Sequence, residues 1–187
     1  MNSERTDPPI ISMVGFSGAG KTTLLERLIS ELTQRGFRVG TVKHDAHGFE
    51  MDKPGKDSWR HKQAGASITV VSSPQKIGMV MDVDHEYRPH EFGPFFRDMD
   101  IVLTEGYKRE HMPKLEVFRP KANEGPFCKN DENLAALISD VPVDLGVPRF
   151  SLDDIKGLAD FLITSFGLVP KSSSGKRKES SGKANQV

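Results

Sequence analysis

The chain has 187 residues, and its 26 basic and 26 acidic side chains cancel to a formal net charge of zero. This length suits one domain with a substantial hydrophobic core. The balanced charge gives no global field that would attract nucleic acid or a membrane surface, so neither is expected as a partner. The one cysteine, Cys128, rules out an internal disulfide and fits a reducing, cytoplasmic compartment.

Composition separates a folded part, residues 9–169, from two polar ends. Residues 1–8 are charged and contain no apolar run of the kind that a targeting signal needs, so we expect a flexible N-terminus. Residues 170–187 are rich in serine, lysine and glycine. Such a segment buries too little apolar surface to offset its ordering entropy, so we expect a disordered basic tail.

The folded part alternates strand-like and helix-like segments. An apolar run at residues 10–14 ends at a glycine-rich turn, and apolar residues then recur at helical spacing from residue 24 to residue 32. Further strands are expected at residues 39–42, 68–71, 77–81, 101–103, 115–118, 134–138 and 148–150, and further helices at 57–65 and 153–166. This alternation predicts an α/β fold, a mostly parallel sheet with helices on both faces. The pair of strands within residues 68–81 would add a small antiparallel hairpin at one edge.

The glycine-rich turn reads Gly-Phe-Ser-Gly-Ala-Gly-Lys-Thr at residues 15–22, which fits the P-loop pattern Gly-x-x-x-x-Gly-Lys-Ser/Thr at every fixed position. Its glycines let the backbone approach phosphates closely, and its N–H groups converge at the N-terminus of the following helix. The motif also stands between an apolar strand and an apolar helix, the context that marks a P-loop NTPase. The residues expected to bind the nucleotide here are Gly15, Ser17, Gly18, Ala19, Gly20, Lys21, Thr22 and Thr23.

Two residues of the motif have defined roles with Mg²⁺ and the transferred phosphate. Lys21 should reach the β- and γ-phosphates, and the Thr22 hydroxyl should bind Mg²⁺. A second metal ligand is expected at the carboxyl end of a neighbouring strand. Asp100 and Glu105 flank the strand at residues 101–103, but Asp100 lies about 16 Å of strand away, at the wrong end. Glu105 is therefore the predicted second metal ligand, and Lys21 and Glu105 are the predicted catalytic residues.

A long charged loop follows the second strand, at residues 44–56. So many ionisable groups beside a phosphate site suggest a switch or substrate loop. Lys43 and Lys56 could meet phosphates, and Asp52 and Asp57 could meet magnesium or water. The alternative for Asp57 is a helix cap. The histidines of this loop lack the Cys/His spacing that is typical of zinc sites.

Five segments, taken in order, are similar to one family. They are residues 14–25 around the P-loop, Val-Lys-His-Asp at 42–45, Asp-Lys-Pro-Gly-Lys-Asp-Ser at 52–58, Ala-Gly-Ala at 64–66 and Leu-Thr-Glu-Gly-Tyr-Lys at 103–108. Together they resemble the molybdopterin-guanine dinucleotide biosynthesis protein B (MobB) family. The resemblance implies a dimeric GTP-binding adaptor with weak GTPase activity, which assists the guanylyltransferase that attaches GMP to molybdopterin. Molybdopterin itself is a further candidate ligand.

Base recognition and two rival functions remain open. The Asn/Thr-Lys-x-Asp motif that GTPases commonly use for guanine does not occur here. Asp140, directly after the strand at residues 134–138, stands where a degenerate form would lie, and an ordinary turn before Pro142 is the alternative. The rivals are a small-molecule P-loop kinase and a metallocentre-assembly GTPase. Scattered arginines speak against the first, and the lack of Cys/His clusters speaks against the second.

Overall fold

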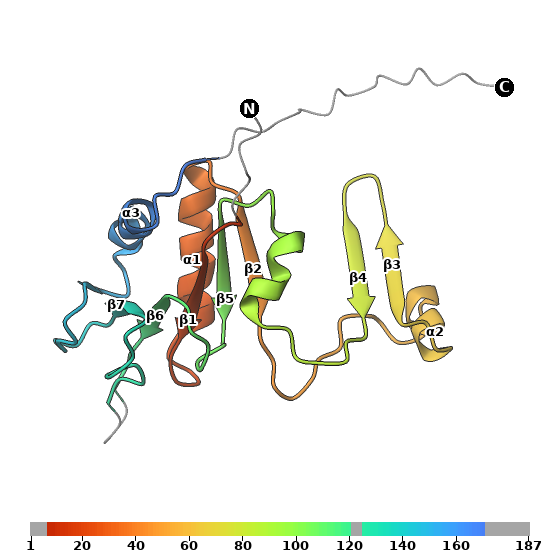
Figure 1. Ribbon diagram of the computed structural model, residues 1–187, viewed down its shortest axis with the longest axis horizontal. Helices are drawn as coiled ribbons and strands as arrows, with labels where there is room; N and C mark the ends of the chain where they lie inside the picture. The colour runs from red at the N-terminus through yellow and green to blue at the C-terminus, as the bar shows by residue number, and fades with distance from the viewer. Residues whose placement is uncertain (1–6, 121–124, 171–187) are drawn as a thin grey trace, which may run out of the picture.

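The computed structural model describes residues 7–120 and 125–170. Its elements are β1 (Ile10–Val14), α1 (Lys21–Gln34), β2 (Val39–Lys43), α2 (Asp57–Gln63), β3 (Ile68–Ser72), β4 (Ile77–Met81), the 3₁₀ helix η1 (Pro89–Phe95), β5 (Ile101–Glu105), β6 (Lys114–Val117), β7 (Leu134–Ile138), β8 (Arg149–Phe150) and α3 (Ile155–Ser165) (Figure 1). The expected flexible N-terminus and basic tail fall almost wholly outside the described residues.

Six strands form one parallel sheet in the order β2-β5-β1-β6-β7-β8. This confirms the predicted α/β fold with a mostly parallel sheet. The strand order changes direction at β1, with β5 on one side and β6 on the other (Figure 1). In open parallel sheets, ligands bind beyond the carboxyl ends of the strands at such a switch point. The P-loop follows β1 and therefore occupies this position.

The main core lies between one face of this sheet and the helices α1 and α3, which contact each other. Leu24, Leu28 and Leu32 recur at helical spacing on α1 and are at most 3% exposed. They meet side chains that alternate along the strands, such as Ile11 and Met13 of β1. Burying one such side chain contributes about 1.5–3 kcal/mol, so this contact fixes α1, and with it the P-loop, on the sheet.

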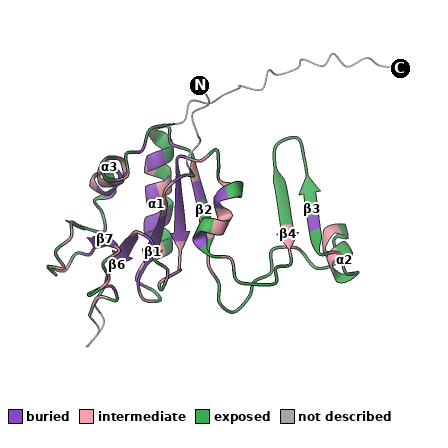
Figure 2. Cartoon of the chain, viewed as in Figure 1, coloured by how far each residue is buried: buried purple, intermediate pink, exposed green. Residues whose placement is uncertain are grey.

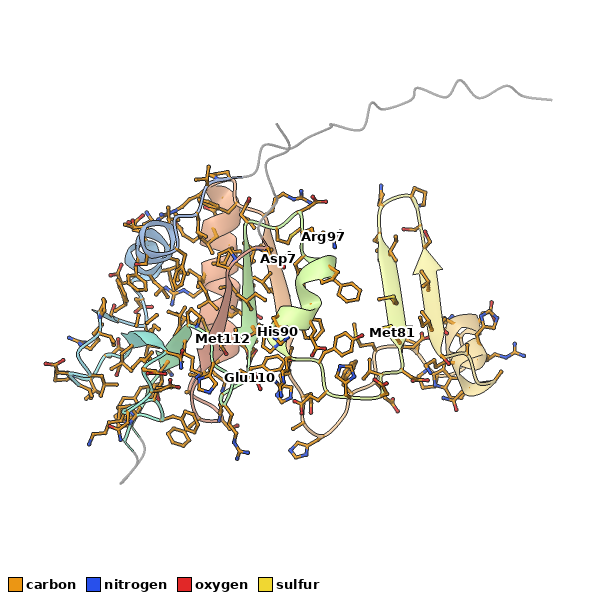
Figure 3. All side chains as sticks on the ribbon, in the orientation of Figure 1. Asp7, Met81, His90, Arg97, Glu110 and Met112 are labelled. Carbon is orange, nitrogen blue, oxygen red and sulfur yellow. The ribbon has the colours of Figure 1, made fainter. Side chains whose placement is uncertain are left out.

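The second face of the sheet is covered mainly by η1 and irregular segments, where regular helices were expected. Phe96, at the end of η1, packs so closely on β2 that a Cβ on Gly40 would lie 2.5 Å from its ring. Glu110 and Met112, labelled in Figure 3, belong to the segment that joins β5 to β6. This join has only eight residues, 106–113, too few for a helical crossover.

The predicted antiparallel hairpin is present, but it is a separate two-stranded sheet and not an edge of the main one. It stands beside the main sheet with α2 packed on β3 (Figure 1). Whereas the main sheet is buried, most of the hairpin is exposed (Figure 2). The local pattern predicts pairing between β3 and β4, but it cannot say where a hairpin on long connections will lie.

In residues 7–120 and 125–170, no helix has both the length and the apolar composition that crossing a bilayer requires.

Candidate functional site

The P-loop turns between β1 and α1 through three glycines in left-handed or related backbone conformations. Gly15, Gly18 and Gly20 have φ values of +142°, +76° and +96°. At Gly15 a side chain would collide with the carbonyl oxygen of Val117 on β6. Glycine is therefore required there by both conformation and space. Gly20 is the N-cap of α1, so the helix begins at Lys21 with its free N–H groups facing the loop.

Lys21 lies over the loop that precedes it. Its Nζ donates hydrogen bonds to the carbonyl oxygens of Gly15, at 3.2 Å, and Phe16, at 2.9 Å. Burial lowers the pKa of Lys21, and Lys108 adds to this, while Glu105 opposes it. A phosphate bound here would favour the charged form, because an anion stabilises a cation beside it. The ammonium is thus placed where the P-loop pattern needs it.

Thr22 and Glu105 meet across the carboxyl edge of the sheet. The Thr22 hydroxyl lies 3.0 and 3.1 Å from the two carboxylate oxygens of Glu105. The register pairs Glu105 of β5 with Met13 of β1, which brings the end of β5 beside the P-loop. A hydroxyl and a carboxylate in contact are oxygen ligands of the kind Mg²⁺ prefers, so the residues fit this ion. Asp100 lies at the opposite end of β5, 4% exposed, and accepts a hydrogen bond from the Arg38 backbone.

The segments after β2 and β5 form one unit beside this pair. Lys43 is the register partner of Glu105, and the His44 backbone N–H donates to the Glu105 carbonyl at 2.9 Å. The His44 ring packs at a tilt of 33° against the Tyr107 ring, with centroids 4.5 Å apart. Gly106 leaves no space between them, since a Cβ there would lie 2.8 Å from the His44 Cβ. Of the four predicted ligand-binding residues Lys43, Asp52, Lys56 and Asp57, Lys43 is therefore the one that the structure brings to the P-loop edge.

Asp52, Lys56 and Asp57 do not line the P-loop of their own chain. Lys56 is the N-cap residue and Asp57 the first residue of α2, which packs on the separate hairpin (Figure 1). Asp52 lies with Ser58 beside a small cavity of about 110 Å³ on that hairpin. These residues follow β2 closely in the chain, but that position did not predict that the loop leads away from the sheet. Any contact of these residues with ligand would have to be made at the hairpin.

Asp140 follows β7 at the same carboxyl edge as predicted, and one of its carboxylate oxygens is already in use. It accepts a hydrogen bond from the Leu152 backbone N–H at 3.0 Å, which fixes the approach to α3. Ser139 is buried, and its hydroxyl accepts from the Val141 backbone N–H at 3.1 Å. The turn is thus structural, and the second carboxylate oxygen of Asp140 is the group that would have to meet a base.

The structure adds three residues to the site that sequence reasoning missed. Phe127 meets Phe16 of the P-loop edge to face, with centroids 6.4 Å apart. The Lys108 ammonium lies over both rings, 5.9 Å from Phe16 and 5.3 Å from Phe127. Arg119, two residues beyond β6, lies against Gly20. Lys108 and Arg119 come shortly after strand candidates, and Lys108 ends the segment 103–108 quoted above, but neither position gives a direction for the side chain.

A buried carboxylate holds Phe127 in this place. Glu116 of β6 is fully buried and accepts hydrogen bonds from the backbone N–H groups of Phe127, at 2.5 Å, and Cys128, at 2.9 Å. Burial and the Glu116 charge raise the pKa of Cys128 to about 12. The thiol is therefore a packing group with no thiolate character at neutral pH. Among the described residues, no group of three or more His, Cys, Asp or Glu side chains could hold a metal.

Comparison with known proteins agrees with this fold. The family model described as MobB, molybdopterin guanine dinucleotide synthesis protein B, matches residues 10–140. The molybdopterin-guanine dinucleotide biosynthesis adapter protein of Escherichia coli (strain K12) is 38% identical over 164 residues, 85% of this chain and 94% of that protein. The protein of the same name from Haemophilus influenzae is 35% identical over 82% of this chain and 87% of its own length.

A crystal structure of Bacillus subtilis MobB superposes with a TM-score of 0.68 at 26% identity, covering 87% of this chain and 99% of the other. Both the sequence and the fold are thus matched over most of their lengths. On these grounds the chain belongs to the MobB family.

Proposed function

We propose that this protein is a GTP-binding adaptor in molybdopterin guanine dinucleotide biosynthesis, with GTP and Mg²⁺ at the P-loop. The observation that carries the proposal is the contact between Thr22 and Glu105 beside the Lys21 ammonium. The names of the relatives supply the pathway and the adapter role. A P-loop kinase or a metallocentre-assembly GTPase would share the phosphate site, but family membership favours the adaptor.

We propose slow hydrolysis at most, as the family resemblance implies. Lys21 would hold the β- and γ-phosphates, and the helix N-terminus would add N–H donors. Thr22 and Glu105 would hold Mg²⁺, which neutralises charge that develops on the phosphate oxygens when it is bound. These groups favour attack at the γ-phosphate, whereas attachment of GMP requires attack at the α-phosphate. Nucleotidyl transfer is therefore assigned to a separate guanylyltransferase.

The charged loop is the proposed contact with that guanylyltransferase or with its pterin substrate. Within it, Phe49 is 68% exposed and Met51 is 75% exposed. Exposed apolar side chains in a polar loop are typical of interaction sites. The loop also carries Lys56 and Asp57 to the hairpin, away from the P-loop. It could thus meet a partner while the P-loop of the same chain holds its nucleotide.

We further propose that the protein works as a homodimer through the exposed hairpin. Strand register puts Ile68, Val70, Ile77 and Met79 on one face of the hairpin, between 41% and 72% exposed. An isolated two-stranded hairpin is marginal in water, and it gains stability when such a face is covered. A second copy of the chain would cover it.

Sedimentation velocity tests the homodimer. The wild type should sediment as a dimer, and the paired substitutions Val70→Lys and Ile77→Lys should give a folded monomer. Val83→Lys is the matched control, because Val83 is 53% exposed but lies beyond β4. A monomeric wild type, or an unaltered dimer in the double variant, would contradict this role of the hairpin.

The adaptor role is tested with a reconstituted reaction of molybdopterin, molybdate, GTP and a guanylyltransferase. The protein should raise the yield of guanylated cofactor when GTP is limiting and should form none alone. Lys56→Ala or Asp57→Ala should reduce this stimulation more than GTP affinity, since both residues lie away from the P-loop. Product formed by this protein alone, or no stimulation, would refute the adaptor.

The lone, unreactive Cys128 fits the cytoplasm, which we propose as the compartment.

A further inference from the structure

The carboxyl end of β6 brings an arginine to the P-loop. A Cβ built on Gly20 would lie 3.7 Å from Cζ and 3.8 Å from Nη2 of Arg119. Gly20 is the N-cap of α1, so the guanidinium lies beside the helix N-terminus. No P-loop pattern includes this residue, which is separated from Gly20 by 99 positions in the chain.

The backbone that carries Arg119 is well fixed. Its neighbour Phe118 is 4% exposed, and the Phe118 N–H donates to the Ile138 carbonyl of β7 at 2.9 Å. Val117, one residue earlier, is fully buried in the core and packs its carbonyl against Gly15. A side chain on so rigid a support keeps its direction toward the loop.

The charges around Arg119 favour an anion. The N-terminus of a helix carries a partial positive charge, which disfavours a cation nearby. Lys21 begins the same helix, and the Lys108 ammonium lies over the Phe16 ring of the loop before it. Within residues 7–120 and 125–170, the exposed Arg119 makes no hydrogen bond or ion pair with a carboxylate. A phosphate bound at this point would offset all of these positive charges.

We propose that Arg119 binds the phosphate groups of the nucleotide held by the P-loop, as a second cation beside Lys21. The inference rests on the proposed nucleotide binding and extends it to a residue outside the motif. The guanidinium offers parallel N–H donors that match two phosphate oxygens, which a lysine ammonium cannot do. The ligand class is a nucleoside diphosphate or triphosphate, recognised here by its phosphates and not by its base.

Isothermal titration of Arg119→Ala with GTP and with inorganic tripolyphosphate tests the proposal. A hydrogen bond to a charged group is worth about 1.5–3 kcal/mol, so both affinities should fall about 10- to 100-fold. Arg119→Lys should retain part of the affinity, because it keeps the charge and loses the paired donors. Arg38→Ala is the matched control: Arg38 is also exposed, but it precedes β2 at the opposite end of the sheet.

The outcomes separate this inference from the proposed function. A loss of GTP affinity without a loss of tripolyphosphate affinity would assign Arg119 to the base or the ribose and overturn the proposal. Equal affinities in Arg119→Ala and Arg38→Ala would also overturn it, while nucleotide binding itself would stand. A wild type that binds neither ligand would overturn both. Melting curves should coincide for all variants, since Arg119 is exposed.

Discussion

Lys21 is partly buried, and its ammonium is satisfied by two carbonyl oxygens of its own loop. Burial lowers its pKa, so its charge carries a desolvation cost in the free protein. Glu105 has a different role at the same edge, because its carboxylate meets the Thr22 hydroxyl directly. At the scale of residues, the site therefore separates a cation suited to phosphate from oxygen atoms suited to a metal ion.

Replacing Lys21 by alanine should remove ligand binding and leave the fold intact. The hydrogen bonds lost with the charged phosphate are worth about 1.5–3 kcal/mol each, so GTP affinity should fall at least about tenfold. Thermal stability should stay the same or rise slightly, since a partly desolvated charge is removed. Isothermal titration with GTP and ATP, together with circular dichroism melting, measures both. A folded variant with unchanged GTP affinity would contradict the phosphate site.

The pair Glu105 and Asp100 tests which end of β5 binds the ligand. Glu105→Gln should weaken hydrolysis and the magnesium dependence of binding, because an amide is a poorer ligand for Mg²⁺ than a carboxylate. Asp100→Asn should instead lower stability, since Asp100 is buried and accepts from the Arg38 N–H. GTP titrations with and without Mg²⁺ and a phosphate-release assay would show the difference. If Asp100→Asn instead had the larger effect on magnesium dependence, the metal would lie at the Asp100 end of β5.

Among the elements, β6 differs from the other central strands by carrying two buried charges on one face. Glu116 holds the segment with Phe127, and the Lys114 ammonium, on a side chain 2% exposed, lies 2.6 Å from the Asp131 carboxylate. Buried charges are tolerated when they are paired and hydrogen-bonded. These two contacts fasten residues 125–133 over the sheet, and they place the aromatic ring beside the P-loop.

Removing Asp131 should destabilise the protein more than removing Lys114. Asp131→Asn leaves the Lys114 charge buried without a partner, at a cost of about 3 kcal/mol. Lys114→Met removes the buried charge itself and should cost less. Urea unfolding of both variants gives the comparison. Equal losses would mean that the ion pair does not hold this segment.

The ion pair between Lys114 and Asp131 also predicts that the free energy of unfolding depends on pH. Burial would raise the pKa of Asp131, but Lys114 and Asn133 outweigh it and lower the pKa below its ordinary value. A carboxyl with a depressed pKa in the fold stabilises above its unfolded pKa of about 4. This contribution is lost as the pH falls through the lower folded value. The difference in unfolding free energy between wild type and Asp131→Asn should therefore shrink from pH 7 toward pH 3.

At the scale of the whole molecule, one buried body and one exposed unit have separate roles. The core of the parallel sheet extends to Leu168, which is 7% exposed, while Val169 is 74% exposed. The hairpin with α2 lies beside this body and shares none of its strand pairing (Figure 1). We therefore assign the proposed nucleotide binding to the body and the proposed association with partners to the exposed unit.

A chain that ends after Pro170 should keep the melting temperature and the GTP affinity of the full chain. Among the described residues, the core cluster extends to Leu168. A chain that ends after Ser165 is the contrasting variant, because it loses Leu168 and Phe166 from the core cluster and its packing. It should melt at a clearly lower temperature. A loss of stability in the first truncation would show that residues 171–187 contact the body.

The sequence by itself determined the local elements and the position of the P-loop. Apolar periodicity is a property of neighbouring residues, so it predicted the strands, the helices α1, α2 and α3 and the pairing of β3 with β4, but not the 3₁₀ helix η1. The P-loop is equally local, since its conformation follows from its own glycines. Glu105 was also accessible, because the carboxyl ends of parallel strands meet at one edge.

Only the tertiary structure decided how distant segments meet. Asp52, Lys56 and Asp57 lie away from the P-loop in the structure. The sequence could not predict this, because the direction of a long connection depends on tertiary packing. It likewise placed Arg119 beside Gly20, because β6 pairs with β1 in the sheet although the two residues are far apart in the chain. Such contacts depend on packing between elements, which no pattern of neighbouring residues encodes.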